Sequence, residues 1–349
     1  MRTIRINASK SYDVIIDKNI ISSCGRLISE TGIKGRIAIV TDKTVDKLYS
    51  ETVTKSLLDN GYEVIKYVVD GGEESKSGRD FLNILEFLAD NGFTRSDSLV
   101  ALGGGVIGDL TGFVASCYLR GIKFVQVPTT LLAFADSSVG GKTAINLKAG
   151  KNLAGAFYQP SLVICDIAVA NTLTPSEYAC GMAEIIKYGM VFDKDLLTLL
   201  EKGMTDNAVE IVARSIDWKR TVVERDEFDN GDRQLLNFGH TLGHAIEIES
   251  GFSIPHGKAV AIGMHLITER AVKNGLCSKT LLERLDGVLD KYDLPKTCEI
   301  PLDKLVNRTL VDKKRKSNYI TVVLPVEDGK CTLNKMTINQ WKEFLLGER

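Results

Sequence analysis

Short apolar runs alternate with helical patterns through the first half of the chain, and this alternation restricts the possible folds more than any other feature. Helical periodicity separates four strand-like runs, at residues 36–41, 62–69, 98–102 and 124–127. Strands joined by helical crossovers pair in parallel, because each crossover returns the chain to the same end of the sheet. We therefore expect an α/β fold with a mostly parallel, Rossmann-like sheet, preceded by a hairpin of residues 4–7 and 14–16.

The alternation ends after one more strand-like run at 162–165, and the pattern from Pro175 onward is chiefly helical. Helical segments are expected at 176–190, 193–202, 206–225, 233–250, 257–274 and 278–292, with one late hairpin of 319–324 and 330–333. A chain of 349 residues fits two domains of about 150 residues each. We expect an α/β, NAD-binding domain over 1–160 and a mainly α-helical, metal- and substrate-binding domain over 161–349.

Composition and charge exclude several classes of protein. The formal net charge is −1, which provides no field for binding nucleic acid or an anionic membrane. The seven cysteines are an odd number and form no C-x-x-C pair, which is typical of reduced thiols in the cytoplasm. The first residues lack the long apolar core expected of a signal peptide, and the sequence contains no run of 18 apolar residues. We expect a cytoplasmic protein with a small-molecule substrate and no nucleic-acid or membrane partner.

A glycine-rich segment, Gly103-Gly-Gly-Val-Ile-Gly108, directly follows the strand-like run 98–102 and opens a helical pattern. The G-x-G-x-x-G spacing lets a phosphate approach the backbone, and the N-terminus of the following helix supplies N–H donors. The acidic residue usual about 20 positions later is missing, so the motif alone equally suits a tight turn. Asp109, next to such a phosphate, is expected to hold the loop or a cofactor hydroxyl.

Two further segments, 136–142 and 150–152, are rich in small residues and are interpreted as loops between strands. Each carries a lysine, Lys142 or Lys151, and Asn152 follows the second. An isolated lysine is most simply a solvated surface residue. Lysines on glycine-rich loops beside a parallel sheet also suit a phosphate or carboxylate ligand, because ammonium groups act as point charges.

The four histidines are the strongest indication of chemistry. His240 and His244 are four residues apart on a predicted helix and so share one face, and His256 follows on a loop. Glu184 lies on an otherwise apolar helical segment and would complete a His-His-Glu set that suits a divalent metal. The spacing leaves open whether His240 or His244 binds the metal while the other moves protons. The fourth histidine, His265, lies in an apolar run and is interpreted as a core residue.

Taken together, these segments resemble the 3-dehydroquinate synthase family, within the sugar-phosphate cyclases, over roughly residues 36–325. The segments that carry the resemblance are 71–76, 103–109, 118–122, 128–133, 136–143, 150–160, 181–189, 237–245, 256–260 and 312–314. One departure is Leu173-Thr-Pro-Ser-Glu177, where the family often has Arg before the glutamate. It affects the detail of a cofactor loop and none of the proposed metal ligands.

The resemblance implies a role for each matching residue. The divalent metal, zinc or cobalt, would be bound by Glu184, His240 and His256. NAD would contact Asp42, Glu73, Lys76, Gly104, Gly105, Val106, Gly108, Asp109, Thr129, Thr130, Asp136, Lys142, Lys151, Thr172 and Glu177. Catalysis would involve Lys142, Lys187, Lys219, Arg233, Asn237 and His244, and the substrate would also contact Arg120, Asn152, and one or both of Lys313 and Lys314. In the family Arg120 reaches a neighbouring subunit's site, which implies a homodimer.

The implied reaction converts 3-deoxy-D-arabino-heptulosonate 7-phosphate to 3-dehydroquinate and phosphate, with NAD recycled. His244, Lys187 and the departing phosphate itself remain candidates for the proton transfers. The alternatives are a related cyclase that makes an aminocyclitol precursor, a metal-dependent polyol dehydrogenase, and a catalytically silent protein of the same fold. The complete set of histidines and lysines favours the first interpretation, a lyase acting on a substrate with both carboxylate and phosphate groups.

Overall fold

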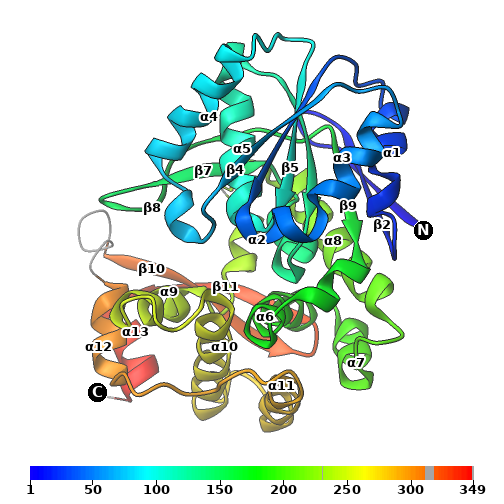
Figure 1. The fold of residues 1–349 in the computed structure, drawn as a ribbon. Helices are drawn as coiled ribbons and strands as arrows, with labels where there is room; N and C mark the ends of the chain where they lie inside the picture. The colour runs from blue at the N-terminus through cyan, green and yellow to red at the C-terminus, as the bar shows by residue number, and fades with distance from the viewer. Residues whose placement is uncertain (230, 311–317, 348–349) are drawn as a thin grey trace. The chain divides into compact units, whose positions relative to one another are not determined.

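The computed structural model describes residues 1–229, 231–310 and 318–347 and divides into two compact units (Figure 1). The first unit comprises Met1–Leu173 with Lys219–Phe228, and the second comprises Thr174–Trp218 with Asp229–Arg349. The first unit thus runs beyond the boundary expected at residue 160, because the strand at 162–166 belongs to its sheet. It also takes in 219–228, which no pattern in the sequence indicated.

The first unit is built on a seven-stranded sheet in the order β1-β2-β9-β6-β5-β3-β4. All neighbouring strands are parallel except β1 and β2, which form the expected N-terminal hairpin. The mostly parallel α/β sheet predicted from the sequence is confirmed. Its strands are β1 (Arg2–Ile6), β2 (Tyr12–Asp17), β3 (Ile37–Asp42), β4 (Val64–Val69), β5 (Ser98–Gly103), β6 (Lys123–Pro128) and β9 (Leu162–Asp166).

Helices cover both faces of this sheet, as Figure 1 shows. Successive residues of β3 point to opposite faces, so Ile37 and Ile39 join one apolar cluster and Ala38 and Val40 join the other. Each fully buried isoleucine or valine side chain stabilises the fold by roughly 1.5–3 kcal/mol. The first cluster is closed by α1 (Cys24–Glu30) and α3 (Glu51–Leu58), and the second by α4 (Gly78–Asp90) and α5 (Gly105–Cys117).

The two segments interpreted as loops belong to a β-hairpin. Segment 136–142 leads into its first strand, and segment 150–152 begins its second strand. Strands β7 (Lys142–Leu147) and β8 (Gly150–Phe157) pair in antiparallel fashion. A side chain on Gly155 would lie 2.1 Å from the carbonyl oxygen of Thr143, so glycine is required where the strands meet. Glycine and alanine have low strand propensity, which is why the sequence pattern did not reveal β8.

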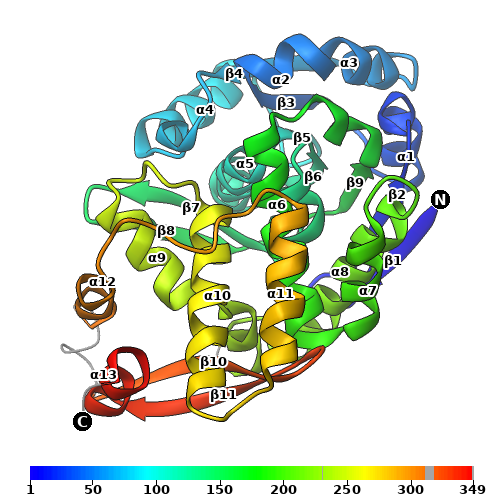
Figure 2. The same cartoon turned by 90° about the horizontal axis from the view of Figure 1, so that it is seen from below.

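The second unit is mainly helical, as expected (Figure 2). Its helices are α6 (Pro175–Phe192), α7 (Lys194–Lys202), α8 (Ala208–Arg225), α9 (His240–Glu249), α10 (His256–Lys273), α11 (Lys279–Lys291), α12 (Leu302–Thr309) and α13 (Ile338–Leu346), with α8 continuing into the first unit. The late hairpin is present as β10 (Tyr319–Glu327) and β11 (Lys330–Thr337). Helices α12 and α13 were not predicted. In the part of the chain that the structure describes, no helix has the length and apolarity to cross a bilayer.

The helix predicted over 233–250 is broken, and the break sets the position of His240. A short 3₁₀ turn, η7 (Asp232–Asn237), is followed by Gly239 with φ 78°, and α9 begins at the next residue. At Gly239 a Cβ atom would lie 2.6 Å from Met264 Cγ and 2.7 Å from the Val260 carbonyl oxygen. The close approach of α10 therefore requires glycine and a left-handed backbone at this point.

We predict that Gly239→Ala destabilises the protein by ~2 kcal/mol or more, because it combines left-handed strain with overpacking against α10. Urea unfolding followed by far-UV circular dichroism measures the loss. Gly275→Ala is the matched control, since Gly275 also has positive φ, but a Cβ atom added there would have no described atom within 4 Å. The control should cost only about 1 kcal/mol. Equal losses in the two variants would contradict the steric explanation.

Candidate active site

Three ligand-type side chains converge inside the second unit. Glu184 lies in the middle of α6, and His240 and His256 are the first residues of α9 and α10. The Nε2 atoms of both histidines lie 3.3 Å from the same carboxylate oxygen, Glu184 Oε1. The ligand atoms of the three residues all lie within 4.8 Å of one another, and the Glu184 side chain is 2% exposed. The structure therefore brings together the His-His-Glu set suggested by the sequence.

Hydrogen bonds at Nδ1 of the two imidazoles determine that their Nε2 atoms face Glu184. His240 Nδ1 lies 3.1 Å from the Phe238 carbonyl oxygen, and His256 Nδ1 lies 3.0 Å from Glu247 Oε2. Both partners are acceptors, so a neutral ring carries its proton on Nδ1 and turns the Nε2 lone pair toward Glu184. Two lone pairs and a carboxylate in contact repel one another unless a cation lies among them. This donor set fits a divalent metal such as zinc.

Charges around Glu184 keep it ionised. Burial opposes ionisation, but the Lys187 ammonium and the neighbouring histidines hold the pKa of Glu184 well below its usual value. Burial lowers the pKa of His256, yet hydrogen bonds to Glu184 and Glu247 outweigh it and raise that pKa to about 10. In the absence of a metal ion, His256 is therefore protonated at pH 7, and its positive charge takes the place of the metal. Lys187, one turn along α6 from Glu184, is itself buried and pairs with it.

The remaining predicted catalytic residues of this unit lie on η7 and α9. The ring centroid of His244 is 5.4 Å from that of His240 and 5.9 Å from that of His256. Although part of the His244 ring is exposed, surrounding protein atoms and the two other imidazoles lower its pKa to about 4, so it is neutral at pH 7. On η7, Arg233 is buried and Asn237 is exposed.

In the first unit, the glycine-rich segment forms the turn between β5 and α5, as the motif predicted. The glycines allow close contacts, because a Cβ atom on Gly104 or Gly105 would lie 2.9 Å from Thr130 Cγ2 or Ser137 Oγ, respectively. Helix α5 begins at Gly105 without a side-chain cap, which leaves its first N–H groups directed out of the turn. Val106 and Gly108 lie in its first turn, and Thr129 is buried after β6.

A polar cluster around the buried Lys76 adjoins this turn. The Lys76 ammonium pairs with Asp109 and donates to Asn152 Oδ1 at 2.5 Å, and Asn152 has φ 57°. Burial raises the pKa of Asp109 to about 6, although Lys76 acts in the opposite direction. Asp109 therefore joins the first turns of α5 to Lys76. The role expected for it at the glycine-rich loop or a cofactor hydroxyl stays a prediction.

Several other predicted residues have structural partners of their own. Lys219 Nζ lies 2.8 Å from Asp136 Oδ1, and Glu73 accepts from the Asn146 amide at 2.7 Å. Asp42 caps the short helix α2 (Lys43–Val45), Thr172 bonds to the Tyr49 hydroxyl, and Glu177 completes a capping box with Thr174 at the start of α6. Lys142, Lys151 and Arg120 are exposed. Lys313 and Lys314 lie outside the described residues.

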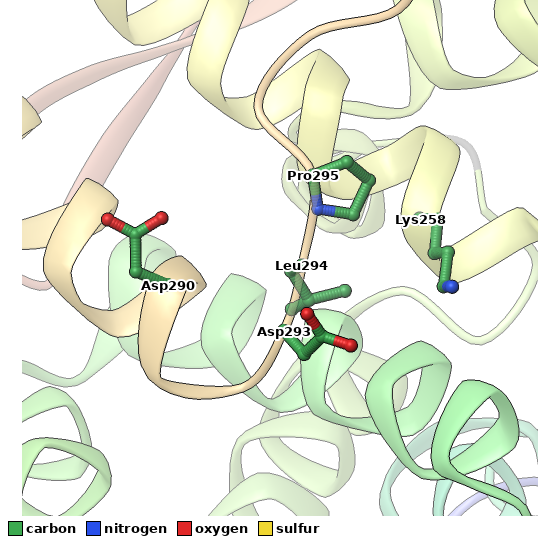
Figure 3. A pocket seen from close by; sticks show the side chains of 5 residues that line it. All are labelled: Lys258, Asp290, Asp293, Leu294 and Pro295. Carbon is green, nitrogen blue, oxygen red and sulfur yellow. The ribbon is translucent and has the colours of Figure 1, made fainter.

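The second unit also has a cavity of about 280 Å³, and Figure 3 shows the residues that line it: Lys258, Asp290, Asp293, Leu294 and Pro295. None of the predicted site residues lines it. The Asp290 carboxylate pairs with Lys296 at 2.7 Å. This cavity is therefore distinct from the histidine cluster.

One residue of the cluster, Glu247, was missed by the sequence analysis. It lies on α9 and contacts His256 through its buried carboxylate. The signal was present, because His240, His244 and Glu247 are spaced by four and then three residues, which places them on one face of a helix.

Solved structures with the same fold define the class of protein. The chain superimposes with a TM-score of 0.87 on 2-epi-5-epi-valiolone synthase from Streptomyces hygroscopicus subsp. jinggangensis 5008, which was solved with NAD⁺ and Zn²⁺ bound. The two are 27% identical, and the alignment covers 99% of each chain. A 2-deoxy-scyllo-inosose synthase has the same fold, with a TM-score of 0.87, 24% identity and 100% coverage of both chains. The fold is thus that of the sugar-phosphate cyclases.

Sequence comparison identifies the family within this class. Residues 66–180 match the model for the N-terminal part of 3-dehydroquinate synthase, and residues 181–315 match the model for its C-terminal part. The chain is 42% identical to the 3-dehydroquinate synthase of Pelobacter propionicus, over 97% of this chain and 98% of the relative. It belongs to the 3-dehydroquinate synthase family.

The raised pKa of Asp109 predicts a pH-dependent stability with a definite sign. Between pH 4 and pH 6 the folded carboxyl binds a proton that the unfolded chain has lost, since its unfolded pKa is about 3.9. Stability from this residue is therefore lost as pH rises through that window. From pH 5 to pH 7.5 the wild type should lose ~1 kcal/mol relative to Asp109→Asn, measured from urea midpoints. Asp90→Asn, at the exposed end of α4, should follow the wild type; a parallel response of all three proteins would contradict the assignment.

Proposed function

We propose that this chain acts as a 3-dehydroquinate synthase. The reaction converts 3-deoxy-D-arabino-heptulosonate 7-phosphate to 3-dehydroquinate and phosphate by transient oxidation with NAD, elimination of phosphate, re-reduction, ring opening and aldol closure. The observation that carries the proposal is the convergence of His240 and His256 on the buried carboxylate of Glu184, in a chain of this family. All seven cysteines are free thiols, which supports the further proposal of a cytoplasmic location.

We propose that NAD binds to the first unit at the turn between β5 and α5. There Gly104 and Gly105 pack closely against Thr130 and Ser137, and α5 begins without a side-chain cap, so its first N–H groups and the helix dipole favour an anion. The bound NAD⁺ of the Streptomyces hygroscopicus cyclase supports a dinucleotide here. Asp42, Glu73, Lys76, Asp109 and the other residues assigned to NAD by resemblance all belong to the first unit, except Glu177.

Glu184, His240 and His256 would hold the divalent metal. When bound, the metal would act as a Lewis acid that acidifies a coordinated hydroxyl of the substrate. Lys187 balances the charge of Glu184 from the same helix and so keeps the carboxylate ionised. His244, which is neutral at pH 7, has a ring nitrogen able to accept a proton from a substrate hydroxyl.

The cationic residues match the charges of the substrate. Lys219 and Arg233 are buried, where a positive charge binds a phosphate or carboxylate more strongly than it does in water. Exposed Lys142, Asn152 and Asn237 supply further donors to hydroxyl and anionic groups. The Asp136 carboxylate, 2.8 Å from Lys219 Nζ, orients that ammonium. Lys313 and Lys314 complete the proposed set for binding phosphate.

We predict that the purified protein, given the heptulosonate phosphate, a trace of NAD and zinc or cobalt, releases phosphate and 3-dehydroquinate in equal amounts. His240→Ala should lose the metal and at least about 100-fold in turnover, because removing a ligand costs more than removing one of its outer partners. His265→Ala is the control, since His265 pairs with Asp286 at 2.7 Å and lies outside the cluster.

Two outcomes of this assay would count against the proposal. Phosphate release without a carbocyclic product would contradict the full reaction. Turnover of glucose 6-phosphate in place of the heptulosonate would instead identify an aminocyclitol-forming cyclase.

We further propose that the chain forms a homodimer in which Arg120 reaches the partner's site. The hairpin exposes apolar side chains, Leu153 at 59%, Leu147 at 48% and Phe157 at 41%, and such a patch typically marks an interface. Tyr158, which follows β8, donates to the Ile122 carbonyl at 2.7 Å and so ties the turn that carries Arg120 to this hairpin.

Subunit complementation tests this proposal. Arg120→Ala and His244→Ala should each be nearly inactive alone. Co-expression in equal amounts should recover about a quarter of wild-type activity, because half of the dimers are mixed and each mixed dimer has one intact site. Mixing Arg120→Ala with the double variant Arg120→Ala/His244→Ala should recover nothing. Inactive mixed dimers would show that Arg120 acts in its own subunit, and a monomer in sedimentation would overturn the dimer.

A further inference from the structure

Glu247 is a buried carboxylate that none of the roles above accounts for. Its side chain is 8% exposed and lies on α9, on the same helical face as His240 and His244. Its Oε2 atom lies 3.0 Å from His256 Nδ1. A buried carboxylate is costly unless it is hydrogen-bonded or paired with a cation, so this contact is a specific feature of the cluster.

The contact fixes both the orientation and the tautomer of His256. The ring lies between two carboxylates, with Nδ1 3.0 Å from Glu247 Oε2 and Nε2 3.3 Å from Glu184 Oε1. Glu247 can only accept when ionised, so a neutral His256 keeps its proton on Nδ1 and presents the Nε2 lone pair to the cluster. His256 itself begins α10, and the two carboxylates that flank its ring lie on neighbouring helices, Glu184 on α6 and Glu247 on α9.

The two histidines of the cluster are supported differently. His240 Nδ1 contacts a neutral backbone carbonyl, whereas His256 Nδ1 contacts a carboxylate. A carboxylate partner makes the ring a more basic and stronger metal ligand than a carbonyl partner does. The arrangement makes His256 the more electron-rich of the two ligands.

We propose that Glu247 is a positioning residue that orients His256 and strengthens its bond to the metal, without contacting the metal itself. This inference rests on the proposed metal site of Glu184, His240 and His256. The alternative is a second cation held by His244, Glu247 and His256, whose ligand atoms also lie within 4.8 Å of one another. A single site is favoured because the same Nδ1 atom would have to give up its hydrogen bond to Glu247 to bind a second ion.

The test is metal affinity, measured by competition of zinc with a chromophoric chelator, together with the visible absorption of the cobalt-loaded protein. Glu247→Ala should weaken zinc binding by about 10–100-fold and alter the cobalt spectrum. Glu247→Gln should fall between Ala and wild type, because its amide oxygen can accept from Nδ1 but carries no charge. At saturating zinc, the activity of Glu247→Ala should recover toward the wild-type value.

Glu249→Gln is the matched control, since Glu249 lies on the same helix and pairs with Lys304 and Arg308 outside the cluster. It should bind zinc as the wild type does. Should Glu247→Ala fail to fold, as judged by circular dichroism, the near-isosteric Glu247→Gln still tests the effect of charge.

The outcomes separate this inference from the proposed function. Wild-type affinity and an unchanged spectrum in both Glu247 variants, with metal lost from His240→Ala, would overturn only the role of Glu247. Two zinc ions per wild-type chain, one of them lost in Glu247→Gln, would establish the second site instead. Metal retained by His240→Ala would overturn the proposed metal site itself.

Discussion

The structure of the site depends on one electrostatic conflict. Two imidazole nitrogens lie 3.3 Å from the same oxygen of the buried Glu184 carboxylate. The repulsion is relieved only by a positive charge, either a proton on His256 or a metal ion. The Lys187 ammonium offsets the charge of Glu184. Contacts with the Phe238 carbonyl and the Glu247 carboxylate orient the two imidazole rings. Stability and metal chemistry are therefore linked at the same three side chains.

The helices of the second unit explain how this conflict is maintained. Both histidines of the cluster are the first residues of their helices, and the carboxylate lies within a third helix that is buried along most of its length. Ligands on helices are positioned more accurately than ligands on loops, because the backbone that carries them is rigid. In the first unit the proposed site for NAD is the turn between β5 and α5, where glycines precede the uncapped start of a helix.

Much of this arrangement could be predicted from the sequence. Alternating apolar and helical patterns predicted the parallel sheet, and the rarity of histidine drew attention to residues that do converge. The sequence failed where main-chain geometry decides the outcome. The expected helix over 233–250 is interrupted at Gly239 by the approach of α10, and β8 is built from small residues that carry no strand signature. Glu247 was missed because a glutamate near the end of a helix, close to Glu249, resembles a surface group until its burial is known.

The contact between α9 and α10 has a consequence for engineering. A Cβ atom at Gly263 would lie 2.0 Å from the carbonyl oxygen of Gly239, so the two backbones meet with no side chain between them. The separation of the helices is then set by main-chain atoms, which substitutions in the apolar core cannot lengthen or shorten. Laboratory evolution toward new substrates should accordingly preserve the spacing of His240 and His256 and accumulate changes in the residues around them.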